Sequence, residues 1–278
     1  MLIFLILGGK SATSCAYSDF GSNFHMRAYF DNNIFVYLEN GTIELKELID
    51  KIDPRINTIF YSSAHMQEAD EITGTTEEER NERISKRIKT IEKITQSNYL
   101  YQDLENNVFY QIRNPAVVLD TIREVPFANR AMKALANLIT EEQRVLARNS
   151  LGLDTAELNN YSTNEVIDHL NRKLVHWGQG HSFLEMIELG ISFHPQGQTF
   201  GLSNRIAGIF ELLDMFGYWK DKANEKSNYA RLWDSSHTFF AAFCDYFISD
   251  DRRARNKARV VYGIYDIGTK VVSSKSGK

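Results

Sequence analysis

Short apolar runs that stop abruptly at polar residues are the first pattern along this chain. Residues 27–30 lead directly into Asp31-Asn32-Asn33, and residues 246–249 lead into Asp250-Asp251. Runs of this length, rich in aromatic and β-branched side chains, are typical of buried strands. We predict strands at 27–30, 56–61, 246–249 and 269–273.

Helical patterns separate these strands. Apolar positions at helical spacing predict a helix at 43–52, with Thr42 as its N-cap and Pro54 just beyond its end. Ser62 or Ser63 is expected to cap a further helix, which carries His65 and Glu68 on one face because they lie three residues apart. Strands that alternate with helices predict an α/β fold, with a parallel sheet flanked by helices.

The middle of the chain, from about residue 75 to 228, is predicted to be mostly helical. Helical segments are expected at 76–96, 115–138, 140–149 and 201–219. The chain has only four prolines and lacks a low-complexity linker, so we expect this region to pack as a helical insertion lobe. The predicted organisation is a leader at 1–25, the first part of the core at 26–114, the lobe at 115–228 and the second part of the core at 229–278.

Composition sets limits on the class of protein. At 278 residues and 43% apolar side chains, the chain is long enough to bury a sizeable core. A net charge of −4 excludes a globally basic nucleic-acid binder and leaves room for a local basic rim. Two cysteines form no disulfide framework, which favours a reducing cytoplasm, and no stretch approaches the length of a transmembrane helix.

The first 25 residues precede the first predicted strand. Gly8-Gly9-Lys10-Ser11 resembles part of a phosphate loop but lacks the earlier glycine of that motif. The basic region and the longer apolar core of a signal peptide are also missing. We expect a disordered and dispensable leader, with Met26 as an alternative first residue.

Carboxylates stand where the predicted strands end or where helices begin. Each has an ordinary alternative: Asp31 as a turn residue, Glu68 as an exposed helix residue, and Asp234, Asp250 or Asp251 as an N-cap. Strand ends are also where α/β sheets place their chemistry, and carboxylates gathered there repel one another unless a cation holds them. The common placement favours a metal site.

In these motifs the chain resembles the PIN-domain nucleases, over roughly residues 26–72 and 229–273. That family has an Asp after its first strand, an acidic residue early in a following helix, an Asp opening a late helix and a Ser/Thr-x-Asp after its fourth strand. The resemblance implies a catalytic, metal-binding set, with Asp250 as an additional ligand: Asp31, Glu68, Asp234 and Asp251. About 165 residues separate Glu68 from Asp234, far more than in compact members of the family.

Polar and basic side chains around these carboxylates are candidates for substrate binding. His65 and His237 each lie one turn from a predicted carboxylate ligand, where they either orient it, touch a phosphate or pack in the helix face. The basic run after Asp251 is either a solvated face or an anchor for the scissile strand. The predicted substrate-binding residues are Asn33, Ser249, His65, His237, Arg252, Arg253 and Lys257.

The resemblance implies a metal-dependent endoribonuclease, such as a toxin or defence effector. It would cleave single-stranded RNA with Mg²⁺ or Mn²⁺, because these hard ions suit carboxylate ligands and reverse the repulsion of a phosphodiester. A protein inhibitor or regulator and an oligomeric state are further expectations. Two alternatives stay open: a structure-selective DNA nuclease of flap-endonuclease type, and a non-catalytic binding module that keeps the fold.

Overall fold

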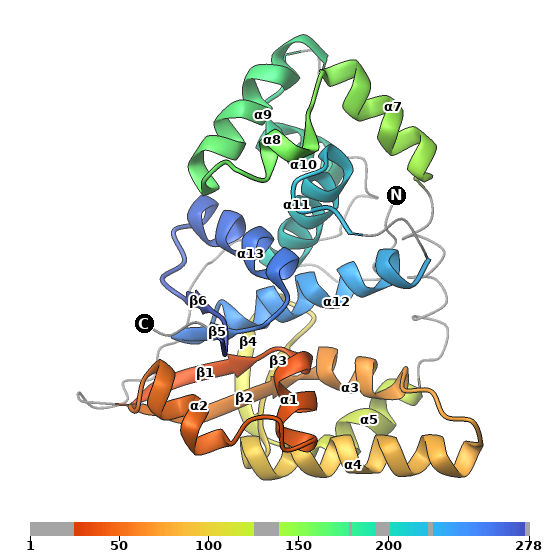
Figure 1. Cartoon of the computed structure of the whole chain (residues 1–278), viewed down its shortest axis with the longest axis vertical. Coiled ribbons are helices and arrows are strands. Elements are labelled where there is room, and N and C mark those ends of the chain that lie inside the picture. Colours follow the sequence, from red (N-terminus) through yellow and green to blue (C-terminus); the bar gives the residue numbers. More distant parts are fainter. Residues whose placement is uncertain (1–24, 125–138, 178–179, 193–200, 222–224, 276–278) are drawn as a thin grey trace. The chain divides into compact units, whose positions relative to one another are not determined.

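A computed structural model describes residues 25–124, 139–177, 180–192, 201–221 and 225–275 (Figure 1). Contacts within the chain divide these residues into two units. The sheet unit comprises described residues up to 124 together with 237–252 and 268–275, and the helical unit comprises described residues between 139 and 236 together with 253–267. The predicted leader lies outside the described residues except for its last residue, His25.

The sheet unit is built on a six-stranded sheet with the order β4-β3-β2-β1-β5-β6 (Figure 1). All neighbouring strands are parallel except β3 and β4, which are antiparallel. The strands are β1 (Met26–Phe30), β2 (Ile56–Ser62), β3 (Asn98–Gln102), β4 (Val108–Ile112), β5 (Tyr246–Ile248) and β6 (Lys270–Val272). The α/β class with a mostly parallel sheet and flanking helices is therefore confirmed, as are the four predicted strands.

The hairpin of β3 and β4 is a correction, because the sequence from residue 75 onward was expected to be mostly helical. Tyr101 of β3 stacks on its cross-strand partner Phe109 of β4, with ring centroids 5.4 Å apart, and Tyr99 stacks on Tyr101 along β3 at 6.2 Å. Aromatic cross-strand pairs of this kind stabilise antiparallel strands. The alternation of aromatic side chains at 99 and 101 was the signal in the sequence for this hairpin.

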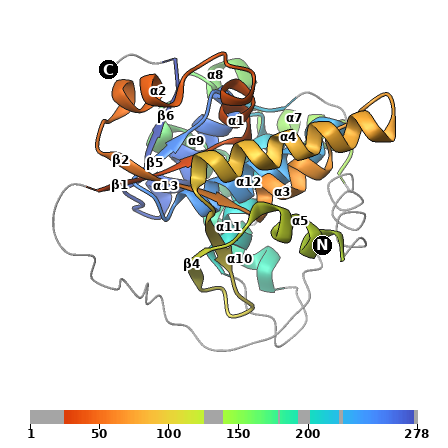
Figure 2. The ribbon, with the colours of Figure 1, turned by 90° about the horizontal axis from the view of Figure 1, so that it is seen from below.

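Helices cover the sheet and complete its core (Figure 2). The core cluster includes Phe30 of β1, Tyr61 of β2 and Ile248 of β5, together with Phe35 and Ile91 from helices that pack against one another. These helices are α1 (Asn32–Glu39), α2 (Leu45–Ile52), α3 (Ser63–Asp70), α4 (Glu77–Thr95) and α5 (Pro115–Arg123). Helix α2 starts later than predicted, with Glu44 rather than Thr42 at its N-cap. Ser62 caps α3, as one of the two predicted alternatives.

Strand register decides which side chains share the site. Tyr29 of β1 pairs with Phe60 of β2 and with Phe247 of β5. Because side chains alternate across a strand, continuing this register by two residues places Asp31, Ser62 and Ser249 at one level and on one face of three neighbouring strands. The carboxyl ends of β1, β2 and β5 therefore present polar side chains side by side.

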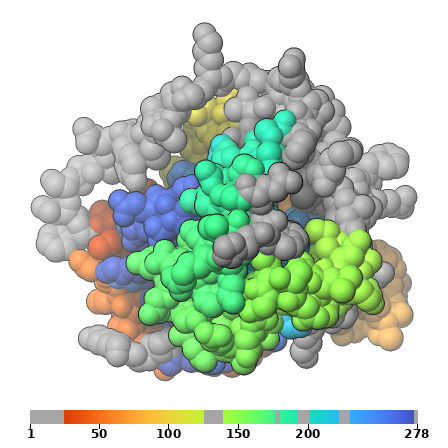
Figure 3. Space-filling view, turned by 90° about the horizontal axis from the view of Figure 1, so that it is seen from above, coloured from red at the N-terminus to blue at the C-terminus, as the bar shows by residue number. Residues whose placement is uncertain are grey.

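In its described residues the helical unit consists of helices that pack against one another. Helix α7 packs against α9 and α11, and α10 packs against α9 and α11. Figure 3 shows the side chains of α7 to α10 as a continuous surface in green and teal. The helices are α7 (Glu141–Leu151), α8 (Thr155–Leu158), α9 (Thr163–Trp177), α10 (Phe183–Ser192) and α11 (Leu202–Phe216), with most of α12 (Glu225–Ala241) and of α13 (Arg252–Ile264).

Buried charges hold these helices together. The carboxylate of Asp214 lies 3.2 Å from Nη1 of Arg144, 2.7 Å from Nη1 of Arg231 and 3.1 Å from Nζ of Lys257. Lys257 is only 1% exposed and also pairs with Asp221 at 3.0 Å. A buried charge with fewer partners would be costly, so the network fixes how α7, α11, α12 and α13 pack.

None of the helices in the described parts of the chain is both long and apolar enough to cross a lipid bilayer.

Candidate metal centre at the ends of β1, β2 and β5

The sheet has a topological switch point between β1 and β5. From β1 the chain moves outward through β2 and β3, and it later returns to add β5 and β6 on the other side of β1. In parallel sheets the crevice beyond the carboxyl ends of the strands at such a point is where ligands bind. Asp31 follows β1 and Ser249 follows β5, so both stand at the carboxyl ends of the two strands that flank this point.

Asp31 is the best-anchored carboxylate of the site. It caps α1, where Oδ1 accepts a hydrogen bond from the Asn32 backbone at 2.7 Å, and Oδ2 accepts from Ser249 Oγ at 2.5 Å. Burial raises the pKa of Asp31 above its ordinary value, against the opposing effects of His237 and of the hydrogen bonds from Ser249 and Asn32. A buried carboxylate with a raised pKa gains from a nearby cation.

Asn33 forms hydrogen bonds to the ends of both β1 and β5. Its amide nitrogen donates to Asp31 Oδ2 and to Ser249 Oγ, the latter at 3.3 Å. Its amide oxygen accepts from the backbone nitrogen of Asp250 at 3.1 Å. Asn33 and Ser249, both predicted to bind substrate, thus hold Asp31 in place within the structure.

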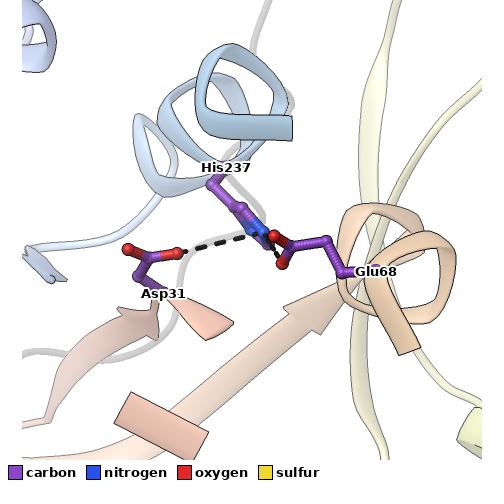
Figure 4. Close-up of side chains that lie close together, drawn as sticks. All are labelled: Asp31, Glu68 and His237. Atoms are coloured by element: carbon purple, nitrogen blue, oxygen red, sulfur yellow. Dashed lines mark hydrogen bonds and ion pairs between the residues drawn. The ribbon is translucent and has the colours of Figure 1, made fainter. Parts of the chain in front are cut away.

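Glu68 and His237 complete the cluster (Figure 4). Nε2 of His237 lies 2.8 Å from Oε2 of Glu68 and 4.0 Å from Oδ1 of Asp31. One ligand atom from each of the three residues lies within 4.8 Å of the other two. Three elements supply the group, because Asp31 follows β1, Glu68 belongs to α3 and His237 belongs to α12.

The imidazole of His237 is fully buried, and both charged groups beside it are carboxylates, those of Glu68 and Asp31. Burial by itself lowers the pKa of a histidine, but the attraction of Glu68, the hydrogen bond to Glu68 and the attraction of Asp31 together raise the pKa of His237. In the absence of another cation, His237 therefore acts as the counter-ion of the two carboxylates. The same arrangement offers one nitrogen and two oxygens to a metal ion.

Tyr29 contacts His237 on the side of the ring that faces away from Glu68, and it was not predicted from the sequence as a residue of the site. Its hydroxyl lies 2.8 Å from Nδ1 of His237 and 2.6 Å from Oγ of Ser62. Burial is the main reason that the pKa of Tyr29 is raised well above its ordinary value, so the hydroxyl keeps its proton. The signal was its spacing: Tyr29 is two residues before Asp31 and so lies on the same face of the strand.

His65 has a structural position. Its Nδ1 accepts a hydrogen bond from the Ser62 backbone at 3.0 Å, and its Nε2 lies 2.7 Å from the carbonyl oxygen of Phe30. Nδ1 therefore carries no proton and Nε2 donates. Burial lowers the pKa of His65 well below its ordinary value, so the ring is neutral. Both nitrogens are engaged within the protein, so of the alternatives for His65 the structure favours packing in the helix face over contact with a phosphate.

The two acids after β5 differ in their surroundings. Asp250 accepts hydrogen bonds from Ser273 Oγ, from the Ser274 backbone and from Ser274 Oγ, at 2.6, 2.9 and 2.6 Å. It thus ties the end of β5 to the segment after β6. Asp251 is half-buried, and its backbone nitrogen donates to Ser249 Oγ at 3.1 Å. Neither belongs to the three-residue group formed by Asp31, Glu68 and His237.

Asp234 does not open a helix, which corrects the prediction. Helix α12 begins at Glu225, so Asp234 lies in its interior, one turn before His237. By contacts Asp234 belongs to the helical unit, whereas His237 belongs to the sheet unit and is the α12 residue in the three-residue group.

The basic run after Asp251 forms the start of α13. Arg252 is exposed, and Arg253 is half-buried. Lys257 is buried, and its ammonium is held by Asp214 and Asp221, so it is not accessible to bind substrate as predicted.

Comparisons with protein-family models, curated proteins and solved structures found no significant match to this chain. The chemistry of the site therefore has to follow from its residues, and the resemblance to PIN-domain nucleases stays an expectation from sequence motifs.

Proposed function

We propose that this chain is a metal-dependent nuclease that hydrolyses phosphodiester bonds of single-stranded RNA. The observation that carries the proposal is the convergence of Asp31, Glu68 and His237 at the switch point of a mostly parallel sheet. The donor set fits a divalent ion, because two carboxylates and an imidazole are common ligands of catalytic metals. Asp31 and His237 are buried, whereas the side chain of Glu68 keeps 22% of its surface exposed to solvent.

Each residue has a defined part in this proposal. Asp31 supplies an oxygen ligand whose position is fixed by the hydrogen bonds from Ser249, Asn32 and Asn33. Glu68 supplies a second oxygen from the second turn of α3. His237 supplies a nitrogen and, without a metal, neutralises the two carboxylates.

When bound, a divalent ion supplies Lewis-acid stabilisation of the phosphate charge and lowers the pKa of a water molecule that attacks phosphorus. Arg252 is exposed at the start of α13, directly after Asp251, and in this proposal it contacts the backbone of the nucleic acid.

The test is cleavage of labelled single-stranded RNA, single-stranded DNA and a flap-structured DNA of one sequence, each in Mn²⁺, in Mg²⁺ and in EDTA. We expect the RNA to be cleaved in Mn²⁺ or Mg²⁺. This cleavage should be lost when EDTA is added and in the Asp31→Asn variant. Cleavage of the flap alone would instead support the DNA nuclease. Binding of RNA without cleavage in any ion would support the binding module and refute the proposal.

A further inference from the structure

We propose that this site selects a first-row transition ion, such as Mn²⁺, over Mg²⁺, and that Tyr29 is the positioning residue responsible for presenting the nitrogen ligand. The inference deepens the proposed function and rests on it. The sequence led us to expect Mg²⁺ or Mn²⁺ without a choice between them. The structure offers a basis for that choice, because one of the three candidate ligands is an imidazole and not a carboxylate.

The geometry around His237 points to Nε2 as a ligand. Nε2 is the ring atom directed at Glu68 and Asp31, at 2.8 and 4.0 Å (Figure 4). Ligand atoms about 2.1 Å from a common ion lie about 3 Å apart when adjacent and about 4.2 Å apart when opposite. The two separations from Nε2 of His237 are close to these values, and all three ligand atoms lie within 4.8 Å of one another.

Ligand chemistry then separates the candidate ions. Mg²⁺ prefers oxygen ligands in a nearly ideal octahedron and gives up its waters reluctantly. Imidazole nitrogen favours transition ions, and affinity at a given site rises along the first-row series. A site made of carboxylates alone would accept Mg²⁺ readily, whereas the nitrogen of His237 shifts the preference of the site toward Mn²⁺ and other first-row transition ions.

Tyr29 decides which nitrogen is offered. A metal-binding imidazole must leave Nε2 bare and keep its proton on Nδ1. Nδ1 lies 2.8 Å from the Tyr29 hydroxyl, whose own proton has an acceptor in Ser62 Oγ at 2.6 Å. In the proposed arrangement His237 donates to Tyr29 and Tyr29 donates to Ser62. The Tyr29 hydroxyl also lies 3.4 Å from Nδ1 of His65, a longer contact than either of these two. Tyr29 is fully buried, so water does not compete for the hydrogen bonds of its hydroxyl.

His65 does not compete for this role. Its ring centroid is only 4.5 Å from that of His237, but its two nitrogens are engaged by the Ser62 backbone nitrogen and the Phe30 carbonyl. The site thus offers an ion a single nitrogen, which makes the contribution of His237 measurable by spectroscopy.

The experiment measures ion binding to the full chain, separately from cleavage. Affinities for Mn²⁺ and Mg²⁺ are measured by calorimetry, and pulsed electron paramagnetic resonance of bound Mn²⁺ reports a directly coordinated ¹⁴N nucleus. The variants are Tyr29→Phe, His237→Gln and Asp31→Asn. Tyr61→Phe is the matched control, because Tyr61 is a buried tyrosine on the adjacent strand whose hydroxyl bonds to the Arg113 carbonyl instead.

We expect Mn²⁺ to bind the wild type with a ¹⁴N signal. Tyr29→Phe should weaken Mn²⁺ binding about 10–100-fold, the usual effect of losing an outer partner of a ligand, and change Mg²⁺ binding by no more than about twofold. Tyr61→Phe should match the wild type. His237→Gln places an amide oxygen near the position of Nε2, so it should lose the signal and narrow the preference for Mn²⁺ over Mg²⁺.

Two outcomes overturn the inference and are distinguishable. If Mn²⁺ binds in an Asp31-dependent way without ¹⁴N coupling, and if His237→Gln keeps the ion preference, the inference fails while the proposed metal site stands. If neither Mn²⁺ nor Mg²⁺ binds the wild type, both the ion preference and the proposed metal site are refuted. Circular dichroism and thermal unfolding of each variant establish that it is folded, and His237→Gln serves as an independent test if Tyr29→Phe does not fold.

Discussion

Nε2 of His237 lies 2.8 Å from Oε2 of Glu68, although 169 positions separate the two residues in the chain. The contact joins α12 to α3 beside the end of β1, where Asp31 stands. Two carboxylates that share a buried site repel each other, and either a protonated His237 or a bound cation relieves this repulsion. Both the proposed activity and the proposed ion preference follow from this relationship.

The charge of Asp31 is predicted to be essential for cleavage and dispensable for folding. Asp31→Asn keeps the size of the side chain but removes a metal ligand, so cleavage of RNA in Mn²⁺ should fall by about 10²–10³-fold or more. Because burial raises the pKa of Asp31, the folded state disfavours its charged form, and the free energy of unfolding should stay level or rise. Single-turnover assays and urea unfolding measure the two effects.

Asp120→Asn is the control for that experiment, because Asp120 is an exposed aspartate on α5 of the same unit. It should leave both cleavage and stability unchanged. Cleavage by Asp31→Asn at the wild-type rate would contradict the proposed site.

Asp250 is predicted to stabilise the fold without acting in the chemistry. Its side chain accepts three hydrogen bonds from Ser273 and Ser274, so Asp250→Ala leaves these donors unpaired. We expect a loss of about 1–3 kcal/mol in the free energy of unfolding. The rate of cleavage per folded molecule should be retained, measured under conditions in which the variant is fully folded by circular dichroism. A loss of chemistry with unchanged stability would show that Asp250 is a ligand after all.

Much of the sheet unit could be predicted from the sequence. The strands at its centre are short apolar runs that end in Asp31 or Asp250, and both burial and the abrupt polar end leave a clear pattern. The positions of Asp31 and Glu68 follow from strand ends and helix spacing. The proximity of Asp31 to Ser249 follows from the parallel register of β1 and β5, which the alternation of strands and helices predicts.

The remaining features of the site depend on tertiary structure. Asp234-Ser-Ser has the composition of an N-cap, but α12 starts nine residues earlier, at Glu225, and the residue that reaches the site is His237. Residues three apart share a helix face, so sequence spacing cannot choose between them. Similarly, a lysine in a basic run is usually solvated, whereas Lys257 is buried by partners far away in the sequence, Asp214 and Asp221.

Lys257 is predicted to be one of the most sensitive positions of the helical unit. Lys257→Met retains most of the aliphatic volume but leaves Asp214 and Asp221 without its charge. Breaking a buried ion pair in this way costs about 3–5 kcal/mol, which urea unfolding would detect. Lys220→Met is the matched control, because Lys220 pairs with Glu141 at the surface and should contribute about 0–1 kcal/mol. Adding Asp221→Asn to Lys257→Met should recover part of the loss.

The pH dependence of stability should reveal the pair formed by Asp53 and Arg55. Nε of Arg55 donates to Oδ1 of Asp53 at 2.9 Å and Nη2 donates to Oδ2 at 2.6 Å, while the hydroxyl of Tyr246 donates to Oδ2 at 2.8 Å. The hydrogen bonds from Arg55 are the main reason that the pKa of Asp53 lies below its ordinary value, despite the opposing effect of burial. Asp53 therefore stabilises the folded state in its charged form.

The sign of the effect follows from linkage. The unfolded chain takes up the proton first, near the ordinary pKa of about 3.9, and the folded chain takes it up only at lower pH. The stabilisation by Asp53 is thus complete above about pH 5 and declines as the pH falls through 3.9 toward the folded pKa. Arg55 is 47% exposed, so solvent screens the pair and the contribution should lie near the lower end of about 1–3 kcal/mol.

The measurement is urea unfolding of the wild type and Asp53→Asn at several pH values from 3 to 7. The difference in the free energy of unfolding should be constant between about pH 5 and 7 and shrink below about pH 4, as the carboxylate becomes protonated. Asp50→Asn, an exposed change on α2 of the same unit, should show little difference at any pH. A difference for Asp53→Asn that stays constant down to pH 3 would mean that its charge does not stabilise the fold, because protonation of the wild type would then have no effect on stability.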